Sequence, residues 1–153
     1  MDIRKAGVND INAIVANRME FIRNIDGQHE VEIPGDFEGN TNVCLKELIE
    51  DNSLVAWMAI DQDVIASIAM VCFYQVLPLM SNRSGKMGYL LNVYTLPEYR
   101  EKGLATTVLN KIIEEAKNRN VGKLYLNATD AGMPLYKKLG FEVLSRDMAL
   151  VIK

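Results

Sequence analysis

The strongest hydrophobic pattern in the chain lies between residues 104 and 118. Apolar residues recur there at every fourth position, at Leu104, Val108, Ile112 and Ala116. Charged side chains fill much of the opposite side of the helical wheel. The spacing predicts an amphipathic helix over 104–118 that packs one face on a core.

Two more helices are predicted in the first third of the chain. Asn9 and Asp10 precede apolar residues at helical spacing that continue to Arg23, and Gly27 is expected to end this helix. Residues 26–40 contain four glycines or prolines among polar residues, which predicts a loop. Residues 42–51 are expected to form the second helix.

Segments rich in β-branched and aromatic residues predict strands between and beside these helices. Asp61, Gln62 and Asp63 separate two of these segments and predict the tight turn of a β-hairpin. Pro97 is expected to end the last of them, because proline donates no backbone hydrogen bond. The predicted strands are residues 3–4, 54–60, 64–77 and 89–95.

The last thirty residues predict a strand at 123–126 and a short helix at 131–139, which Gly140 ends. Two final strands are expected at 141–144 and 148–152. Strands and helices in this order indicate the α/β (α+β) class, with a mixed sheet between helices.

Length and charge narrow the function classes. A chain of 153 residues fits one compact domain, so we expect residues 1–153 to form a single unit. The net charge is −3, and no basic face is evident, so we expect no nucleic-acid partner. No apolar run is long enough to cross a bilayer, and no signal peptide is evident. We therefore expect no membrane partner and a cytoplasmic location.

The sequence offers little metal or histidine chemistry. Cys44 and Cys72 lie in apolar stretches and are expected to be buried thiols. His29 is the only histidine, and no cluster of cysteines and histidines has the spacing of a zinc site. We expect no metal cofactor.

The segment most informative about chemistry is 92–106, where a predicted strand turns sharply into the long helix. Gly103 lets the backbone approach a ligand, and Arg100 and Lys102 add positive charge beside the free amides of the helix start. This arrangement favours a phosphate or pyrophosphate. A glycine that caps a helix between solvated charges explains the same spacing equally well. The segment lacks the glycines of a Walker loop or a dinucleotide fingerprint.

Two motifs resemble those of the GNAT (GCN5-related) N-acetyltransferase superfamily. Pro97-Glu-Tyr-Arg100-Glu-Lys-Gly103-Leu-Ala105 is similar to its Arg/Gln-x-x-Gly-x-Gly/Ala motif. Leu135-Tyr136-Lys-Lys-Leu-Gly140-Phe141 is similar to its Tyr-x-x-x-Gly-Phe segment. Both stand in the family's order, and the resemblance covers essentially the whole chain. It implies the GNAT acyl-CoA fold, in which a central, mostly antiparallel, twisted sheet has helices on both faces.

The resemblance also implies an acetyl-CoA-dependent N-acetyltransferase acting by direct attack in a ternary complex. Backbone amides of the turn would bind the coenzyme A pyrophosphate, and a bulged fourth strand would pair with the pantetheine arm. Glu101 is unusual in this motif, and its side chain is expected to point to solvent. The residues expected to bind the cofactor are Val93, Tyr94, Thr95, Arg100, Glu101, Lys102, Gly103, Leu104, Ala105, Thr106, Asn127 and Thr129.

Tyr136 matches the family's general acid. A phenol can return a proton to the coenzyme A thiolate as it leaves. A backbone N–H near Val93 or Tyr94 would stabilise the oxyanion. No general base is assigned; Asn92 could orient a water molecule, and Glu20 is more simply a solvated helix residue.

The resemblance places the amine acceptor against residues 19–48. The region contains Arg23, Asp26, His29, Glu30, Glu32, Asp36 and Glu38. Five of these seven are acidic, which favours a cationic amine, in a small molecule or a peptide. The competing function is a catalytically silent module that binds or senses acyl-CoA, and a nucleotide-binding protein is a weaker alternative. A homodimer is common in the family, but the sequence does not decide it.

Overall fold

The computed structural model describes residues 1–25 and 32–153. Short 3-10 turns at Val8–Asp10 (η1) and Pro97–Tyr99 (η3) lead into two of the helices. The helices are α1 (Ile11–Asn24), α2 (Phe37–Glu50), α3 (Leu104–Asn118) and α4 (Met133–Lys138). The strands are β1 (Asp2–Lys5), β2 (Leu54–Asp61), β3 (Val64–Gln75), β4 (Lys86–Thr95) and β5 (Lys123–Tyr125).

The five strands form one sheet in the order β1-β2-β3-β4-β5. Neighbours are antiparallel from β1 to β4, whereas β4 and β5 are parallel. Gln62 and Asp63 form the predicted β2–β3 turn with φ values of 46° and 69°. The short turn and the apolar, β-branched composition of the flanking segments therefore predict this hairpin correctly.

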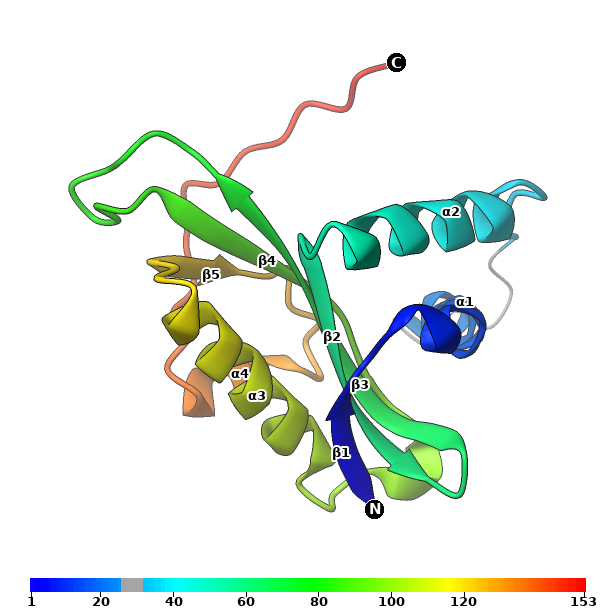
Figure 1. Ribbon diagram of the computed structural model, residues 1–153. Coiled ribbons are helices and arrows are strands. Elements are labelled where there is room, and N and C mark those ends of the chain that lie inside the picture. The colour runs from blue at the N-terminus through cyan, green and yellow to red at the C-terminus, as the bar shows by residue number, and fades with distance from the viewer. Residues whose placement is uncertain (26–31) are drawn as a thin grey trace.

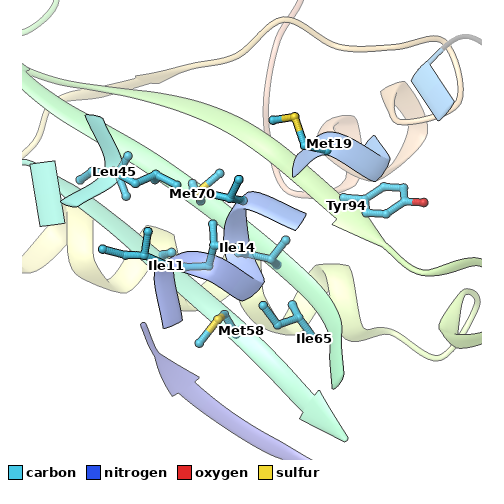
Figure 2. Close-up of a cluster of buried hydrophobic side chains, with 12 residues drawn as sticks. Ile11, Ile14, Met19, Leu45, Met58, Ile65, Met70 and Tyr94 are labelled. Atoms are coloured by element: carbon cyan, nitrogen blue, oxygen red, sulfur yellow. The ribbon is translucent and has the colours of Figure 1, made fainter. Parts of the chain in front are cut away.

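Helices α1 and α2 cover one face of the sheet (Figure 1). Between them and the strands lies the first hydrophobic cluster, which includes Ile14, Met58 and Ile68, all fully buried. Figure 2 shows side chains from α1, α2, β2, β3 and β4 meeting in this layer. The residues that it labels are Ile11, Ile14, Met19, Leu45, Met58, Ile65, Met70 and Tyr94.

Helix α3 covers the opposite face with the apolar stripe that the sequence predicts. Val108, Leu109 and Ile112 are fully buried and meet Val71 and Leu90 of the sheet in the second hydrophobic cluster. Residues of α4 pack against the same cluster. A mixed, mostly antiparallel sheet with helices on both faces is the predicted class, and the structure confirms it. No helix in the described part of the chain is long and apolar enough to span a membrane.

Three smaller expectations are wrong. Helix α2 begins at Phe37, five residues before the expected start, because Phe37 packs on the first cluster and Gly39 falls in a first turn whose amides need no helical partner. Strand β4 begins at Lys86, where a loop was expected, because it pairs with Gln75 of β3. Cys44 is exposed rather than buried, whereas Cys72 is partly buried.

The two strands expected at 141–144 and 148–152 are absent. Phe141 donates its backbone N–H to Tyr136, but every residue from 142 to 153 is exposed and none pairs with the sheet. Figure 1 shows this red end of the ribbon leading away from the sheet. Strand propensity alone does not form a strand, since a strand also needs a neighbour with free backbone groups.

Candidate functional site

A bulge interrupts β4 within its pairing with β3. Ile68 pairs with Tyr94 and Met70 pairs with Leu91, so Asn92 and Val93 together oppose Ala69. Asn92 takes the left-handed conformation at φ 51°, which asparagine tolerates better than most residues. One residue of β4 is therefore left without a partner in the ladder, as expected for strands that bind a ligand through their backbone.

On the side of β4 that faces β5, the strand pairing ends a few residues before the bulge. Its pairing with β5 covers only Met87–Gly88–Tyr89 of β4, and the last pair joins Tyr89 to Tyr125. Beyond that pair the two strands separate, so no described strand pairs with this edge of β4 from Leu90 to Thr95. An extended chain with amide groups can enter such an opening and take up the backbone hydrogen bonds of the strand.

The turn that follows β4 exposes a row of backbone donors. Within the described chain, none of the N–H groups of residues 101–106 donates a hydrogen bond to the protein. Gly103 caps α3 at φ 75°, and a side chain there would meet nothing within 4 Å, so the space in front of it is open. Unpaired amides at a helix start attract anions, because the helix dipole adds positive charge there.

The side chains around this turn strengthen the positive charge. Arg100 donates from Nε to the carbonyl of Thr95 at 3.1 Å, which anchors the turn to the end of β4. The Lys102 ammonium lies 5.1 Å from the centre of the Tyr99 ring, a cation–π distance. Glu101 adopts φ 61° and is exposed, which is the orientation expected for an acid beside an anion site.

Tyr136 lies on α4 and is partly buried against the second cluster, which also includes Val93 of the bulge and Leu104 of the turn. Its ring meets Phe141 edge-on with 5.8 Å between centroids. Burial raises the pKa of the Tyr136 phenol, so the group stays protonated through neutral pH. Tyr136, Val93 and Leu104, which are far apart in sequence, therefore border the same apolar cluster.

Asn127 and Thr129 occupy the connection between β5 and α4. Asn127 is exposed, and Thr129 accepts the backbone N–H of Gly132 at its hydroxyl, 3.2 Å away. Thr129 thus helps to start α4, which is a turn-forming role. Whether either residue also binds a cofactor stays a prediction.

A polar network lies on the α1 side of the bulge. Asn92 is buried and donates to Asn17 Oδ1 at 3.2 Å, while its own Oδ1 accepts from Arg18 at 3.5 Å. Arg18 is half-buried, and this burial lowers the pKa of its guanidinium. Arg18 was not predicted as a site residue, although its spacing from Ile14 and Ile22 places it on the apolar face of α1 and could have revealed it.

Glu20 and Tyr94 form a second contact beside this network. The Tyr94 hydroxyl donates to Glu20 Oε1 at 3.3 Å, and burial together with the Glu20 charge raises the pKa of Tyr94. The Arg100 guanidinium lies 5.9 Å from the centre of the Tyr94 ring.

Part of the expected acceptor region cannot be placed. Asp26, His29 and Glu30 lie outside the described residues. Arg23, Asp36 and Glu38 are exposed at the ends of α1 and α2 that face this region. Within residues 1–25 and 32–153, no group of three histidine, cysteine or acidic side chains could hold a metal ion.

Solved structures match the chain along nearly its whole length. A predicted acetyltransferase from Clostridium acetobutylicum, crystallised with acetyl-CoA, superposes with a TM-score of 0.89 and 31% identity over 98% of this chain and 95% of that one. A GCN5-related N-acetyltransferase from Ralstonia eutropha JMP134 has the same fold, with a TM-score of 0.84 at 22% identity over 99% and 97% of the two chains.

Sequence relatives match a shorter segment. Glucosamine 6-phosphate N-acetyltransferase from Trypanosoma brucei brucei is 30% identical over 69 residues, which are 44% of this chain and 47% of the relative. Mouse thialysine N-epsilon-acetyltransferase is 31% identical over 70 residues, 44% of this chain and 41% of the relative. The match thus spans under half the length of either relative. The sequence model of the Acetyltransferase (GNAT) family matches residues 20–141, and the chain belongs to this family.

Proposed function

We propose that this chain transfers the acetyl group of acetyl-CoA to a primary amine of a small molecule or peptide. The observation that carries the proposal is the row of unpaired amides at 101–106, next to a bulged β4 that has separated from β5. A row of free amides and an open strand edge follow one another along the chain here. Coenzyme A has the matching shape, with a pyrophosphate joined to an amide-containing arm.

Backbone groups would do most of the binding. The amides of residues 101–106 would hold the pyrophosphate, with Arg100 and Lys102 adding charge near them. The pantetheine arm would lie along the free edge of β4, against the backbone of Val93. The Thr95 carbonyl already accepts a hydrogen bond from Arg100. It can accept a second hydrogen bond, from the pantetheine arm, only at its other lone pair.

Two groups would act on the reacting atoms. A backbone N–H released by the bulge, at Val93 or Tyr94, would donate to the thioester oxygen as negative charge forms on it, an effect of about 3–4 kcal/mol for one donor. Tyr136 would then protonate the thiolate of the departing coenzyme A. The raised pKa of Tyr136 suits an acid, because the phenol keeps its proton until the thiolate forms.

The acceptor would carry an anionic group as well as its amine. Arg18 is half-buried beside the bulge, and no carboxylate pairs with it among the described residues. A carboxylate or phosphate of the acceptor would supply the missing charge. The glucosamine 6-phosphate of the trypanosomal relative's name is such an amine. The acidic residues between α1 and α2 favoured a cationic amine as the acceptor. Arg18 adds the expectation that this amine also carries an anionic group.

Release of free coenzyme A in the presence of amines tests the proposal. We expect acetyl-CoA turnover with an amine that bears phosphate or carboxylate, and glucosamine 6-phosphate should be used better than glucosamine. Tyr136→Phe should lower kcat by about 100-fold or more with little change in KM, which is the usual size of a lost general acid. Tyr74→Phe, on an exposed tyrosine of β3, is the matched control and should retain activity.

The alternative is a silent module that binds acyl-CoA without turnover. It predicts thermal stabilisation by acetyl-CoA but no amine-dependent release of coenzyme A from any acceptor. No stabilisation by acetyl-CoA would contradict both readings. Residues 1–153 would act as a single catalytic domain in the cytoplasm.

A further inference from the structure

The loop that joins β3 to β4 carries an apolar tip, residues 77–80. Leu77 and Met80 are 83% and 100% exposed, and Pro78 and Leu79 between them are exposed as well. Apolar side chains are costly to leave in water, so a contiguous exposed group of them marks an interaction surface.

Hydrogen bonds hold the apolar tip in this exposed arrangement. Leu79 and Asn82 exchange backbone hydrogen bonds of 2.9 and 3.0 Å across the turn that contains Met80. Below this turn, the backbone N–H of Val76 donates to the Gly85 carbonyl at 2.8 Å. The loop therefore cannot fold back and bury its apolar side chains without breaking these bonds.

The hairpin that carries the tip extends past the rest of the sheet. The pairing of β2 with β3 reaches only to Cys72, and the pairing of β5 with β4 begins only at Met87. Figure 1 shows the loop between β3 and β4 projecting beyond the neighbouring strands. A stable protein interface takes about 20–30 residues on each side, far more than this narrow tip offers. A projecting tip is better suited to a surface that it can penetrate, such as a lipid bilayer.

The charge around the hairpin is positive, although the chain as a whole has a net charge of −3. All 20 acidic residues lie outside the segments 64–97 and 116–129, which contain β3, β4, β5 and the end of α3. The cations in these two segments are Arg83, Lys86, Lys117, Arg119 and Lys123. Cations without nearby carboxylates attract an anionic surface.

A polar cavity of about 480 Å³ lies at the base of the tip, between the hairpin and the turn from α3 to β5. It is lined by Ser81, Asn82, Arg83, Ser84, Asn120 and Gly122. Gly122 permits this close approach, since a side chain there would collide with Asn82. Lys123 donates from Nζ to the Ser81 hydroxyl at 2.8 Å, and within the described chain Arg83 has no hydrogen bond or ion pair. A cation and a hydroxyl are thus available for a phosphate group.

We propose that the β3–β4 hairpin docks the protein on the surface of an anionic phospholipid membrane. The apolar tip enters the boundary between headgroups and acyl chains, while Arg83, Lys86 and Lys123 contact lipid phosphates. Apolar area and attraction to anionic lipids act together in such binding, and neither needs to be large alone. The expectation of no membrane partner rests on the lack of a spanning run, and a surface contact needs none.

Docking through the hairpin leaves the candidate cofactor site accessible. The hairpin joins β4 at Lys86, whereas the turn with the free amides follows Thr95 at the other end of the strand. A strand of ten residues separates the two ends by roughly 30 Å, at about 3.4 Å per residue. The hairpin can therefore be altered without changing the groups that would bind coenzyme A, and the membrane contact does not depend on acetyl transfer.

Co-sedimentation with vesicles tests the proposal. The unmodified chain should sediment with vesicles of phosphatidylcholine and phosphatidylserine but not with phosphatidylcholine alone, and high salt should release it by screening the cations. Leu77→Ser combined with Met80→Ser should lower the partition coefficient about tenfold or more, because apolar area is lost. Arg83→Gln combined with Lys86→Gln should lower it about fivefold for each charge removed.

Matched controls come from α2. Val43→Ser removes an exposed apolar side chain and Lys46→Gln removes an exposed cation, both outside the hairpin, and neither should change the partition coefficient. The side chains changed in the two hairpin variants are all exposed, so these variants should keep the thermal unfolding midpoint of the unmodified chain.

Four outcomes would overturn the proposal. Failure of the unmodified chain to sediment with anionic vesicles would rule out membrane docking. Equal sedimentation with neutral vesicles would remove the role of the cations. Binding that survives both hairpin variants would assign the contact to another surface. A lipid-free dimer that Leu77→Ser with Met80→Ser converts to a monomer, measured by light scattering, would mean that the tip binds a second copy of the chain instead.

A fluorescence measurement identifies the inserted residue. Met80→Trp places an indole at the apex of the tip, and its emission should shift to shorter wavelength and be quenched by brominated lipid when anionic vesicles are added. Val43→Trp on α2 is the control and should show neither change; Trp57 contributes the same background to both variants. Vesicle-bound Met80→Trp protein without a shift would show that the tip does not enter the bilayer.

Discussion

Strand β4 is held in two different ways by its two neighbours. On one side it pairs with β3 from Gln75–Lys86 to Ser67–Thr95, and a single bulge interrupts the ladder. On the other side only three pairs join it to β5, and then the strands part. Residues 65–71 of β3 are buried, whereas all three residues of β5 remain partly exposed.

This difference separates stability from binding. Strands β2, β3 and β4 pair with one another over most of their length and contribute Met58, Ile68 and Met70 to the core, so most of the folding free energy is expected there. The side of β4 that faces β5 has an open edge, and the turn that follows β4 exposes the unpaired amides of residues 101–106. These groups are costly to leave unpaired, and a cofactor is the partner that we propose for them.

The largest effect should come from emptying the core beside β3. Ile68 is fully buried and lies opposite Tyr94, so Ile68→Ala should cost about 2–5 kcal/mol of unfolding free energy. Leu124→Ala in β5 should cost roughly half as much or less, because Leu124 is only partly buried and its surroundings can relax. Chemical denaturation of both variants measures the difference.

If Leu124→Ala lowered the unfolding free energy as much as Ile68→Ala does, the β3 side and the β5 side of β4 would not differ in stability. Equal losses would mean that the β5 side contributes as much to the free energy of unfolding as the β3 side does.

The elements predicted well are those whose determinants are local. The fourfold apolar repeat specifies α3 at both ends, and the Asp61-Gln62-Asp63 turn specifies the β2–β3 hairpin. The strands expected at 141–144 and 148–152 depend on a partner strand, which no pattern within their own residues reveals. Helix α2 starts early for a similar reason, since the contact of Phe37 with the core is a tertiary one.

The features of the candidate site also differ in whether a local sequence signal predicts them. Gly103 and the helix start are visible in the sequence, because a glycine before an amphipathic helix is a local signal. The bulge at Asn92 and Val93 depends on the register between β3 and β4, so it could be expected only through the family resemblance. Arg18 becomes informative only when its burial beside Asn92 is known.

Substitution at the bulge should have an intermediate effect. Asn92→Ala would leave Asn17 without its buried donor and would force alanine into the left-handed region, at a cost of about 1–2 kcal/mol for the conformation alone. Asn92→Gly removes the same hydrogen bonds but fits φ 51° without that strain. The glycine variant should therefore be the more stable of the two by denaturation. Equal stabilities would mean that the bulge relaxes and that its backbone is not held in place.

The smallest effect should appear at the charged edge of the sheet, far from β5. Asp10 accepts two hydrogen bonds from Arg4, at 2.8 and 2.9 Å, and one from the backbone of Gly7. The Arg4 hydrogen bond is the main reason that the pKa of Asp10 falls below its ordinary value of 3.8. A carboxyl with a lowered folded pKa stabilises the protein above its unfolded pKa, and the contribution disappears as pH falls through the folded one.

Asp10→Asn should thus lower the unfolding free energy by less than about 1 kcal/mol at pH 6–8, because Arg4 is largely solvated. The difference from the unmodified chain should shrink below pH 4. Asp2→Asn, which removes a looser contact to the same arginine at 3.7 Å, is the control and should change little at any pH. A loss that persists unchanged at pH 2 would mean that Asp10 acts through its shape at the start of α1. The ion pair would then contribute nothing to the stability of this edge.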